Sequence, residues 1–258
     1  MDKNSLLYWY PKIKNLGVPT PKTEIVLLND DEKQAYYRGE DCFDLARLER
    51  EIKRAISENF SLPVFLRTDE FSNKHFWKRS CYLNSLQNLR EHLFEIISGS
   101  RLADFLGGLP IEAIIVREYI EMDFRFRAFF GEMPVNPERR YFVRDGKVEC
   151  HHPYWTEDAI GNGTAKDKLP FNWKKILSNL NFESQEELNI LNRYSITVAN
   201  TIQGYWSIDY CKAKNGRWIL IDMAEGDKSW HPSCRYSNVQ EMPKQDKHNL
   251  SSIVRKKD

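Results

Sequence analysis

The spacing of apolar residues along the chain predicts a mixture of strands and helices in which strands dominate the middle. Two amphipathic helices are predicted by apolar residues at helical spacing, namely Leu45, Leu48, Ile52 and Ile56 for the first, and Leu86, Leu89, Leu93 and Ile97, with a stop at Gly99, for the second. A third helix is predicted up to residue 202, with its apolar face beginning at residue 188. Strands are predicted at residues 24–28, 64–67, 111–119, 124–130 and 140–149. The polar residues 68–75 and the glycine- and aspartate-containing residues 155–173 are expected to form loops.

Two β-rich runs near the end of this pattern predict a hairpin. They flank Asn215-Gly216, a pair typical of a tight two-residue turn. With that turn, Lys214 lies opposite Arg217, and pairing continues outward from there. Five positions further out on each strand, this register places two aspartates opposite each other on one face of the hairpin.

These aspartates are Asp209 and Asp222, and they point to a metal site. Their β-carbons would lie roughly 5 Å apart, where like charges repel. A divalent cation between them removes that repulsion, because Mg²⁺ prefers carboxylate oxygens and is commonly shared with a phosphate. Glu225 follows within reach as a third ligand. The alternative, that one aspartate caps a turn or pairs with a lysine, is left open by the hairpin alone.

Composition and charge argue against several classes of protein. The 258 residues include 38 basic and 37 acidic side chains, so no net field attracts nucleic acid or an acidic membrane surface. The first residues lack the apolar run of a signal peptide, and no segment approaches the roughly 20 apolar residues of a membrane span. We therefore expect a cytoplasmic protein without membrane or nucleic-acid partners. The polar residues 236–258 are expected to be a disordered tail.

Several basic residues occupy positions suited to binding a triphosphate. Arg67 ends a predicted strand and enters a loop that contains Lys74, a combination that can close over phosphates. Strand parity places Arg127 on the polar face of the predicted strand 124–130. Arg140 begins the next strand. For each arginine taken singly, an exposed surface side chain is the alternative, because charged residues are mostly solvated.

Common phosphate and hydrolase motifs are absent from the sequence. It contains no Gly-x-x-x-x-Gly-Lys-Ser/Thr loop, and no Gly-x-Gly-x-x-Gly follows a predicted strand. It also lacks the Gly-x-Ser-x-Gly element of serine hydrolases. These absences argue against a Walker-type nucleotide site, a dinucleotide site and a serine hydrolase.

The order of the remaining motifs resembles the ATP-grasp superfamily over about residues 18–231. Within it, the chain is most similar to a small phage and bacterial clade with arginines in place of the usual phosphate-binding lysines, related to the eukaryotic translation-initiation assembly chaperone. The motifs that carry the resemblance are the proline-rich entry Val18-Pro-Thr-Pro-Lys-Thr23, Arg67, Arg117-Glu-Tyr-Ile120, the strand and turn from Glu138 to Gly146, and Asp209 with Asp222-Met-Ala-Glu225.

The resemblance implies an α+β fold of two lobes that hold ATP between them, with a first lobe at residues 1–115 and a second at 116–235. It implies that Arg67 and Lys74 bind phosphates, that Arg140 faces the γ-phosphate and that Glu118, Tyr119 and Ile120 form the hinge that binds adenine, with Arg117 at its start. It also implies Mg²⁺ bound by Asp209, Asp222 and Glu225. One departure concerns the metal, because the family usually ends this motif with an acid, one spacer and an asparagine, whereas Ala224 stands here.

The resemblance implies a magnesium-dependent ligase that phosphorylates a carboxylate and passes the acyl group to an amine or a thiol. The donor and acceptor would be small molecules or peptides. An ATP-binding assembly factor without catalytic activity, acting on a protein partner, is the alternative. A metal-dependent nuclease or phosphatase would account for the aspartates but not for the arginines and the hinge.

Overall fold

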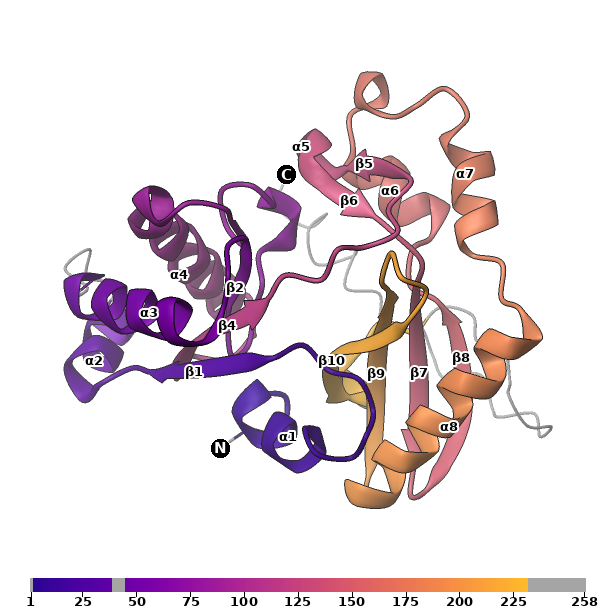
Figure 1. Ribbon diagram of the computed structural model, residues 1–258, viewed down its shortest axis with the longest axis horizontal. Helices are drawn as coiled ribbons and strands as arrows, with labels where there is room; N and C mark the ends of the chain where they lie inside the picture. The colour runs from indigo at the N-terminus through magenta and orange to yellow at the C-terminus, as the bar shows by residue number, and fades with distance from the viewer. Residues whose placement is uncertain (1, 39–44, 232–258) are drawn as a thin grey trace.

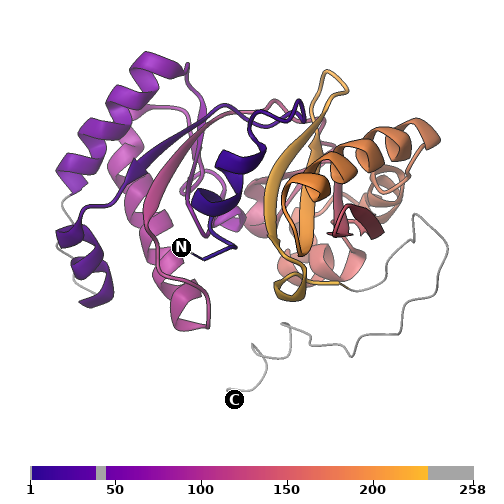
Figure 2. The same cartoon turned by 90° about the horizontal axis from the view of Figure 1, so that it is seen from below.

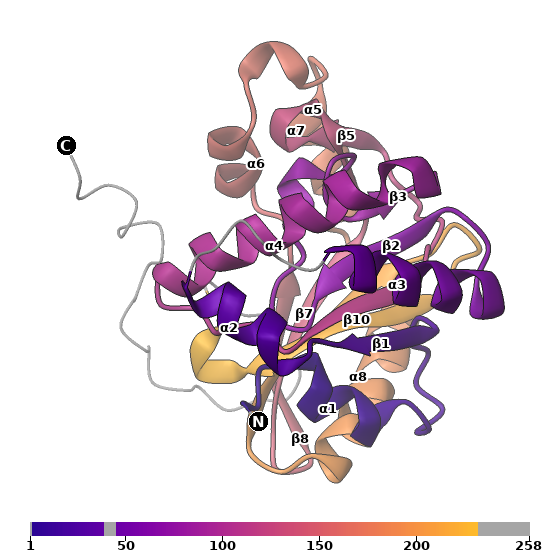
Figure 3. The same ribbon diagram turned by 90° about the vertical axis from the view of Figure 1, so that its left-hand side faces the viewer.

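The computed structural model describes residues 2–38 and 45–231, so the tail predicted at 236–258 lies outside the described residues. A first lobe is built on a four-stranded sheet in the order β1-β4-β2-β3, with all neighbours antiparallel. Its strands are β1 (Thr23–Leu27), β2 (Val64–Thr68), β3 (Tyr82–Leu83) and β4 (Ala113–Glu118). The helices α2 (Asp30–Arg38), α3 (Leu45–Asn59) and α4 (Leu89–Phe105) lie on its outer side (Figure 1, Figure 3).

A second lobe is built on an antiparallel sheet in the order β10-β9-β7-β8. Its strands are β7 (Glu138–Arg144), β8 (Lys147–Pro153), β9 (Tyr205–Lys212) and β10 (Trp218–Glu225). Asp145 and Gly146 turn the chain between β7 and β8 with φ of 45° and 82°, as the Asp-Gly pair predicts. Helices α1 (Leu6–Ile13) and α8 (Gln185–Thr201) pack on one face of this sheet (Figure 1, Figure 2).

Smaller elements surround the space between the lobes. A two-stranded sheet of β5 (Phe126–Ala128) and β6 (Met133–Val135) is joined by the short helix α5 (Phe129–Glu132). It lies beside α6 (Glu157–Gly163) and α7 (Trp173–Leu180) (Figure 1). Four 3-10 turns complete the described elements: η1 (Lys74–Phe76), η2 (Leu86–Asn88), η3 (Lys166–Lys168) and η4 (Gly226–Lys228).

The helix α1 joins the two lobes. Its residues Leu6, Trp9 and Ile13 share one buried cluster with Ile115 of β4 and with apolar residues of β7, β9, β10 and α8. The backbone N–H of Leu6 donates to the Asp69 carbonyl of the first lobe at 3.0 Å. The hydrophobic core therefore runs from one sheet to the other through α1. Among the described residues, no helix has both the length and the apolar character needed to cross a bilayer.

Three of the expected elements differ in the structure. Helix α4 continues through Gly99 to Phe105, and Gly99 allows a close approach, because a Cβ there would lie 2.7 Å from Nδ2 of Asn73. The strand expected at 124–130 is short, since the chain turns at Phe129 and Phe130 with φ of 50° and 49°. The loop expected at 155–173 contains α6 and η3. An acidic first turn and the Thr156 cap were enough to start α6 despite its glycines.

Candidate functional site

A cavity of about 390 Å³ lies between the two sheets. It has an apolar end, formed by Phe65, Trp77, Tyr119, Met122, Met133 and Pro134, and a polar end, formed by charged residues of both lobes. Nine of the residues singled out from the sequence line it: Arg67, Lys74, Arg117, Glu118, Tyr119, Ile120, Arg140, Asp209 and Asp222. Arg127 and Glu225 are not among the lining residues.

Strand alternation in the first lobe aims two arginines at the cavity. In β2, Val64 and Leu66 pack outward against the helices, so Phe65 and Arg67 face inward. In β4 the same alternation turns Arg117 inward. Both arginines are buried, at 4% and 3% exposure. Burial is exceptional for arginine and indicates that these side chains have a specific purpose.

Arg117 has donors that no described residue satisfies. Its Nη1 donates to the Ile221 carbonyl at 2.5 Å, whereas its Nε and Nη2 have no hydrogen-bond partner within the described ranges. Burial, followed by repulsion from Arg67, lowers the pKa of Arg117 to about 9, so it remains a cation at neutral pH. Buried, unpaired N–H groups on a cation suit an anion in the cavity.

The hairpin β9–β10 places Asp209 directly opposite Asp222, as predicted. The register reaches this pairing by two offsets that cancel. Near the turn, Lys212 pairs with Trp218 and Ala213 donates to the Arg217 carbonyl, one residue away from the expected pairing. A bulge between Leu220 and Asp222 then restores the register.

Each of the two aspartates is paired with an arginine. Arg140 donates from Nε and Nη2 to the two oxygens of Asp209, both at 2.7 Å. Arg67 Nη1 lies 3.0 Å from Asp222 Oδ1. These arginines supply the positive charge that the sequence assigned to a metal. Both pairs lie on the cavity wall, so a ligand that competes for the arginines would release the carboxylates.

Glu225 lies apart from this pair. Its carboxylate is 3.3 Å from the Lys3 ammonium, and its backbone N–H donates to Asn4 at 2.7 Å. The pairing of β10 with β9 is regular from Asp222 to Glu225, so no second bulge turns Glu225 toward the cavity. Within residues 2–38 and 45–231, no group of three or more His, Cys, Asp or Glu side chains is arranged to hold a metal ion.

Lys74 links the first lobe to the second. Its ammonium lies 3.8 Å from Glu138 Oε2 and over the rings of Tyr154 and Trp155, at 4.3 and 4.8 Å from their centroids. Burial alone would lower the pKa of Lys74, but the opposing charges of Tyr154 and Glu138 outweigh it and raise the pKa. Burial raises the pKa of Glu138, against the effect of Lys74.

The two residues after Lys74 also stack on the second lobe. His75 is parallel to Phe129 with ring centroids 4.1 Å apart, and Phe76 is stacked on Phe130 at 4.7 Å. Burial, followed by the nearby Lys74, lowers the pKa of His75 to about 4, so the ring is neutral at physiological pH. We name residues 72–77 the clasp, because three consecutive side chains of this segment contact the opposite lobe.

The predicted hinge crosses between the lobes at the apolar end. After β4 the chain runs through Tyr119 and Ile120 to Met122, which forms a bridge with Ala213 beside the hairpin. The Glu118 side chain accepts a hydrogen bond from the Lys22 backbone at 2.8 Å. By contrast, Arg127 lies over the Phe124 ring at 5.0 Å, outside the cavity lining.

Sequence reasoning missed three polar residues of the lining, namely Glu70, Asn136 and Tyr154. Burial, followed by the neighbouring Asp69, raises the pKa of Glu70 to about 8. Glu70 could have been noticed as an acid directly after Arg67-Thr68-Asp69 in the predicted loop. Asn136 and Tyr154 carry no such signal, because their place depends on how β6, β7 and β8 assemble.

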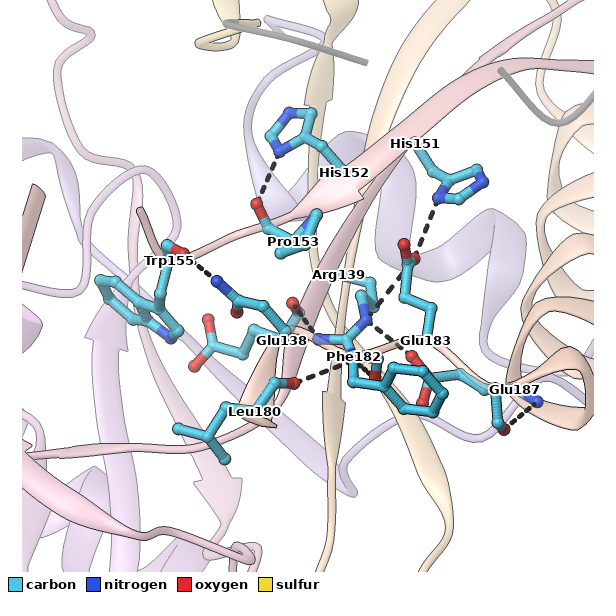
Figure 4. A network of polar contacts seen from close by, with 12 residues as sticks. Glu138, Arg139, His151, His152, Pro153, Trp155, Leu180, Phe182, Glu183 and Glu187 are labelled. Atoms are coloured by element: carbon cyan, nitrogen blue, oxygen red, sulfur yellow. Dashed lines mark hydrogen bonds and ion pairs between the residues drawn. The ribbon is translucent and has the colours of Figure 1, made fainter. Parts of the chain in front are cut away.

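A buried ionic network holds β7 from the side opposite the cavity (Figure 4). Arg139, which is fully buried, donates to Glu187 at 2.6 Å and to the carbonyls of Leu180 and Phe182 at 3.0 and 2.9 Å. Glu183 lies 3.6 Å from Arg139 and 3.0 Å from His151 Nδ1. Since neighbouring strand residues point to opposite faces, this network fixes the strand that presents Glu138 and Arg140 to the cavity.

The cavity residues fit a magnesium-bound nucleotide. The unpartnered donors of Arg117 suit a phosphate, and the facing carboxylates of Asp209 and Asp222 are hard oxygen ligands of the kind that Mg²⁺ prefers. The apolar end offers aromatic and aliphatic surfaces to a flat base.

Comparison with known proteins gives the family. Residues 53–242 match an ATP-grasp domain family, which is family 3 of the clade named for two arginines and a lysine. No curated protein matches the sequence.

Solved structures share the fold. C-terminally truncated Cdc123 from Schizosaccharomyces pombe has a TM-score of 0.54 and 14% identity, over 86% of this chain and 83% of that chain. D-alanine–D-alanine ligase from Bacillus anthracis, complexed with ATP, has a TM-score of 0.45 and 12% identity, over 86% and 54%. N5-carboxyaminoimidazole synthase from Aspergillus clavatus, complexed with ADP and 5-aminoimidazole ribonucleotide, has a TM-score of 0.45 and 10% identity, over 86% and 43%. This chain thus spans about half the length of these two enzymes.

Proposed function

Because this chain belongs to family 3 of that clade of ATP-grasp domains, we propose that it is a magnesium-dependent, ADP-forming ligase. In the proposed reaction, a carboxylate attacks the γ-phosphorus of ATP and releases ADP. An amine or a thiol then attacks the resulting acylphosphate and releases phosphate, which leaves an amide or a thioester. A small-molecule or peptide carboxylate and an amine or thiol acceptor are the substrates that we propose, with the reaction taking place in the cytoplasm.

One observation carries this proposal. Three arginines, of which Arg67 and Arg117 are buried, and two facing aspartates converge on a single cavity from both lobes, next to an apolar end and the hinge. Phosphoryl transfer is catalysed mainly by positioning and by neutralising charge, and it requires no covalent nucleophile from the protein. The cavity contains the groups that such chemistry needs.

The residues take separate roles in this reaction. Arg67, Arg117 and Arg140 bind and orient the phosphates from the two sheets, and Arg140 stabilises the charge that develops as the γ-phosphoryl group moves. Asp209 and Asp222 would hold Mg²⁺, which neutralises phosphate charge when it is bound. The clasp excludes water, which a reactive acylphosphate requires in order to survive until the acceptor attacks.

A non-catalytic assembly factor is the second candidate, and the metal residues favour it. Ala224 stands where the family usually has an asparagine, and Glu225 is bound to Lys3 and Asn4 instead of lining the cavity. A site with only two carboxylates can bind a nucleotide yet lack the ligand that a fully active enzyme uses. In that case nucleotide binding would order the clasp, and a protein partner would dock beside it.

Release of ADP distinguishes the two candidates. The purified chain is incubated with magnesium and ATP, with and without pooled amino acids, polyamines and peptides, and products are identified by mass spectrometry. A ligase gives ADP, phosphate and a new conjugate, all of which depend on the acceptor and are lost in Asp222→Asn. Tight ATP binding without turnover, together with a protein that co-purifies, identifies the assembly factor.

A further inference from the structure

Asn136 presents a buried acceptor to the cavity. The residue is 0% exposed, and its Nδ2 donates to the Pro137 carbonyl at 3.3 Å. The reverse orientation of the amide would set two oxygens against each other, so this contact fixes Oδ1 as the group facing away from Pro137. Oδ1 has no hydrogen-bond partner among the described residues. Because a buried acceptor without a donor is unfavourable, a bound molecule is expected to supply one.

The position of Asn136 is at the hinge end of the cavity. The next residue, Pro137, accepts a hydrogen bond from the Lys212 backbone at 2.9 Å, and the Lys212 carbonyl accepts from Asp123 at 3.3 Å. Asn136 therefore lies where the chain leaving the hinge meets the start of β7. Met133, three residues earlier, packs in the same cluster as Tyr119 and Met122.

The phosphate-binding groups lie further along the same strand. Arg140 pairs with Asp209, whereas Glu138 pairs with Cys211, two residues closer to Asn136. At ~3.3 Å per residue, the four residues between Asn136 and Arg140 span roughly 13 Å. A nucleotide whose phosphates lie at Arg140 thus extends its base toward Asn136, between Tyr119, Met133 and Pro134.

We propose that Asn136 determines base specificity by accepting a hydrogen bond from the exocyclic amino group of adenine. This inference rests on the proposed function, which puts ATP in the cavity. A purine with an oxygen at that position brings acceptor against acceptor and is rejected, and a purine with only hydrogen there leaves Oδ1 unpaired. The backbone of the hinge binds the base as well, but the side chain of Asn136 adds a choice among purines.

A cycle of two changes tests the contact. Binding of ATP, inosine triphosphate and purine riboside triphosphate, which has hydrogen in place of the amino group, is measured by calorimetry with magnesium for wild type and Asn136→Ala. We expect Asn136→Ala to weaken ATP binding roughly tenfold, or ~1.4 kcal/mol, and to leave purine riboside triphosphate unchanged. Asn192→Ala is the matched control, because Asn192 Oδ1 on α8 is likewise buried without a partner but lies outside the cavity lining.

Further arms separate the outcomes. Asn136→Asp keeps an oxygen at the same place and is expected to retain the preference for ATP over purine riboside triphosphate, so the inference stays testable if the alanine variant does not fold. Equal weakening of ATP and purine riboside triphosphate by Asn136→Ala would overturn it. So would coupling to 2′-deoxy-ATP or 3′-deoxy-ATP instead, since the donor would then be a ribose hydroxyl. Binding of no nucleotide by wild type would overturn the proposed function itself.

Discussion

Arg140 and Asp209 face each other across neighbouring strands and bind through two hydrogen bonds of 2.7 Å. One residue is the predicted ligand of a phosphate and the other the predicted ligand of a metal. Arg67 and Asp222 repeat the arrangement at 3.0 Å. The ligand-free site thus neutralises its own charges, and magnesium and nucleotide must exchange partners with it when they bind.

Replacing either arginine should weaken nucleotide binding. Arg67→Ala and Arg140→Ala each remove a charged donor to the phosphates, which is worth about 1.5–3 kcal/mol. Arg54→Ala is the matched control, because Arg54 is also ion-paired but is exposed on α3. Calorimetric titration with magnesium-ATP measures the differences. Losses that were the same for all three variants would contradict the phosphate assignment.

Metal binding should depend on the nucleotide. Since each aspartate is held by an arginine, wild type should bind Mn²⁺ weakly in the absence of ATP. Arg140→Ala frees Asp209 and should strengthen binding of Mn²⁺ alone, whereas Asp209→Asn and Asp222→Asn should weaken binding of the metal-ATP complex. Electron paramagnetic resonance of free Mn²⁺ measures each case. Unchanged metal-ATP affinity in both asparagine variants would rule out the metal site.

The raised pKa of Glu70 makes stability depend on pH. Its pKa rises from 4.5 to about 8 on folding, so between these values the folded chain keeps a proton that the unfolded chain releases. Stability from this group is complete below about pH 4.5 and falls as the pH rises toward 8. Glu70→Gln cannot titrate, so its melting temperature relative to wild type should rise between pH 5 and pH 8. The exposed Glu58→Gln should show no such trend.

Nucleotide should protect the clasp from hydrogen exchange. Residues 68–77 and the hinge 118–120 should both gain protection on addition of magnesium-ATP, because the nucleotide contacts them from inside the cavity. Phe76→Ala removes the stack on Phe130 and should speed exchange in the ligand-free clasp, whereas Phe171→Ala, at a fully exposed side chain, should not. Protection confined to residues 151–152 would place the ligand elsewhere.

The network behind β7 should be costly to break. Arg139→Ala leaves Glu187 buried without its partner, and losses of about 3–5 kcal/mol are typical of such changes. Arg144→Ala, on the same strand, removes an ion pair with Glu149 whose arginine is 42% exposed, and should cost less than ~1 kcal/mol. Denaturation by urea gives both values. Similar small losses would mean that Arg139 does not secure the strand.

Local patterns predicted the hairpin and the inward-facing arginines because alternation and turn residues determine both. The facing of Asp209 and Asp222 was correct although the turn was one residue different, since the bulge at Ile221 compensates. The sequence could not reveal that arginines pair with these aspartates, because Arg67 and Arg140 come from strands far away along the chain.

Other features depend on tertiary packing and left no local signal. Phe129 and Phe130 read as strand residues, yet they adopt positive φ because their rings stack on the clasp. Helix α1 contains Pro11 and was not expected as a helix, but its apolar residues fill the space between the sheets. Asn136 gains its role only where β6 meets β7.

The helix α1 has a consequence for how ligands enter. It is bonded to Asp69 in the first lobe and, through Asn4, to Glu225 in the second, and it shares its core with both sheets. Swinging the lobes apart would tear this shared core and expose apolar surface to water. Ligand exchange should therefore proceed by a local detachment of the clasp, with the two sheets staying at a fixed separation throughout the catalytic cycle.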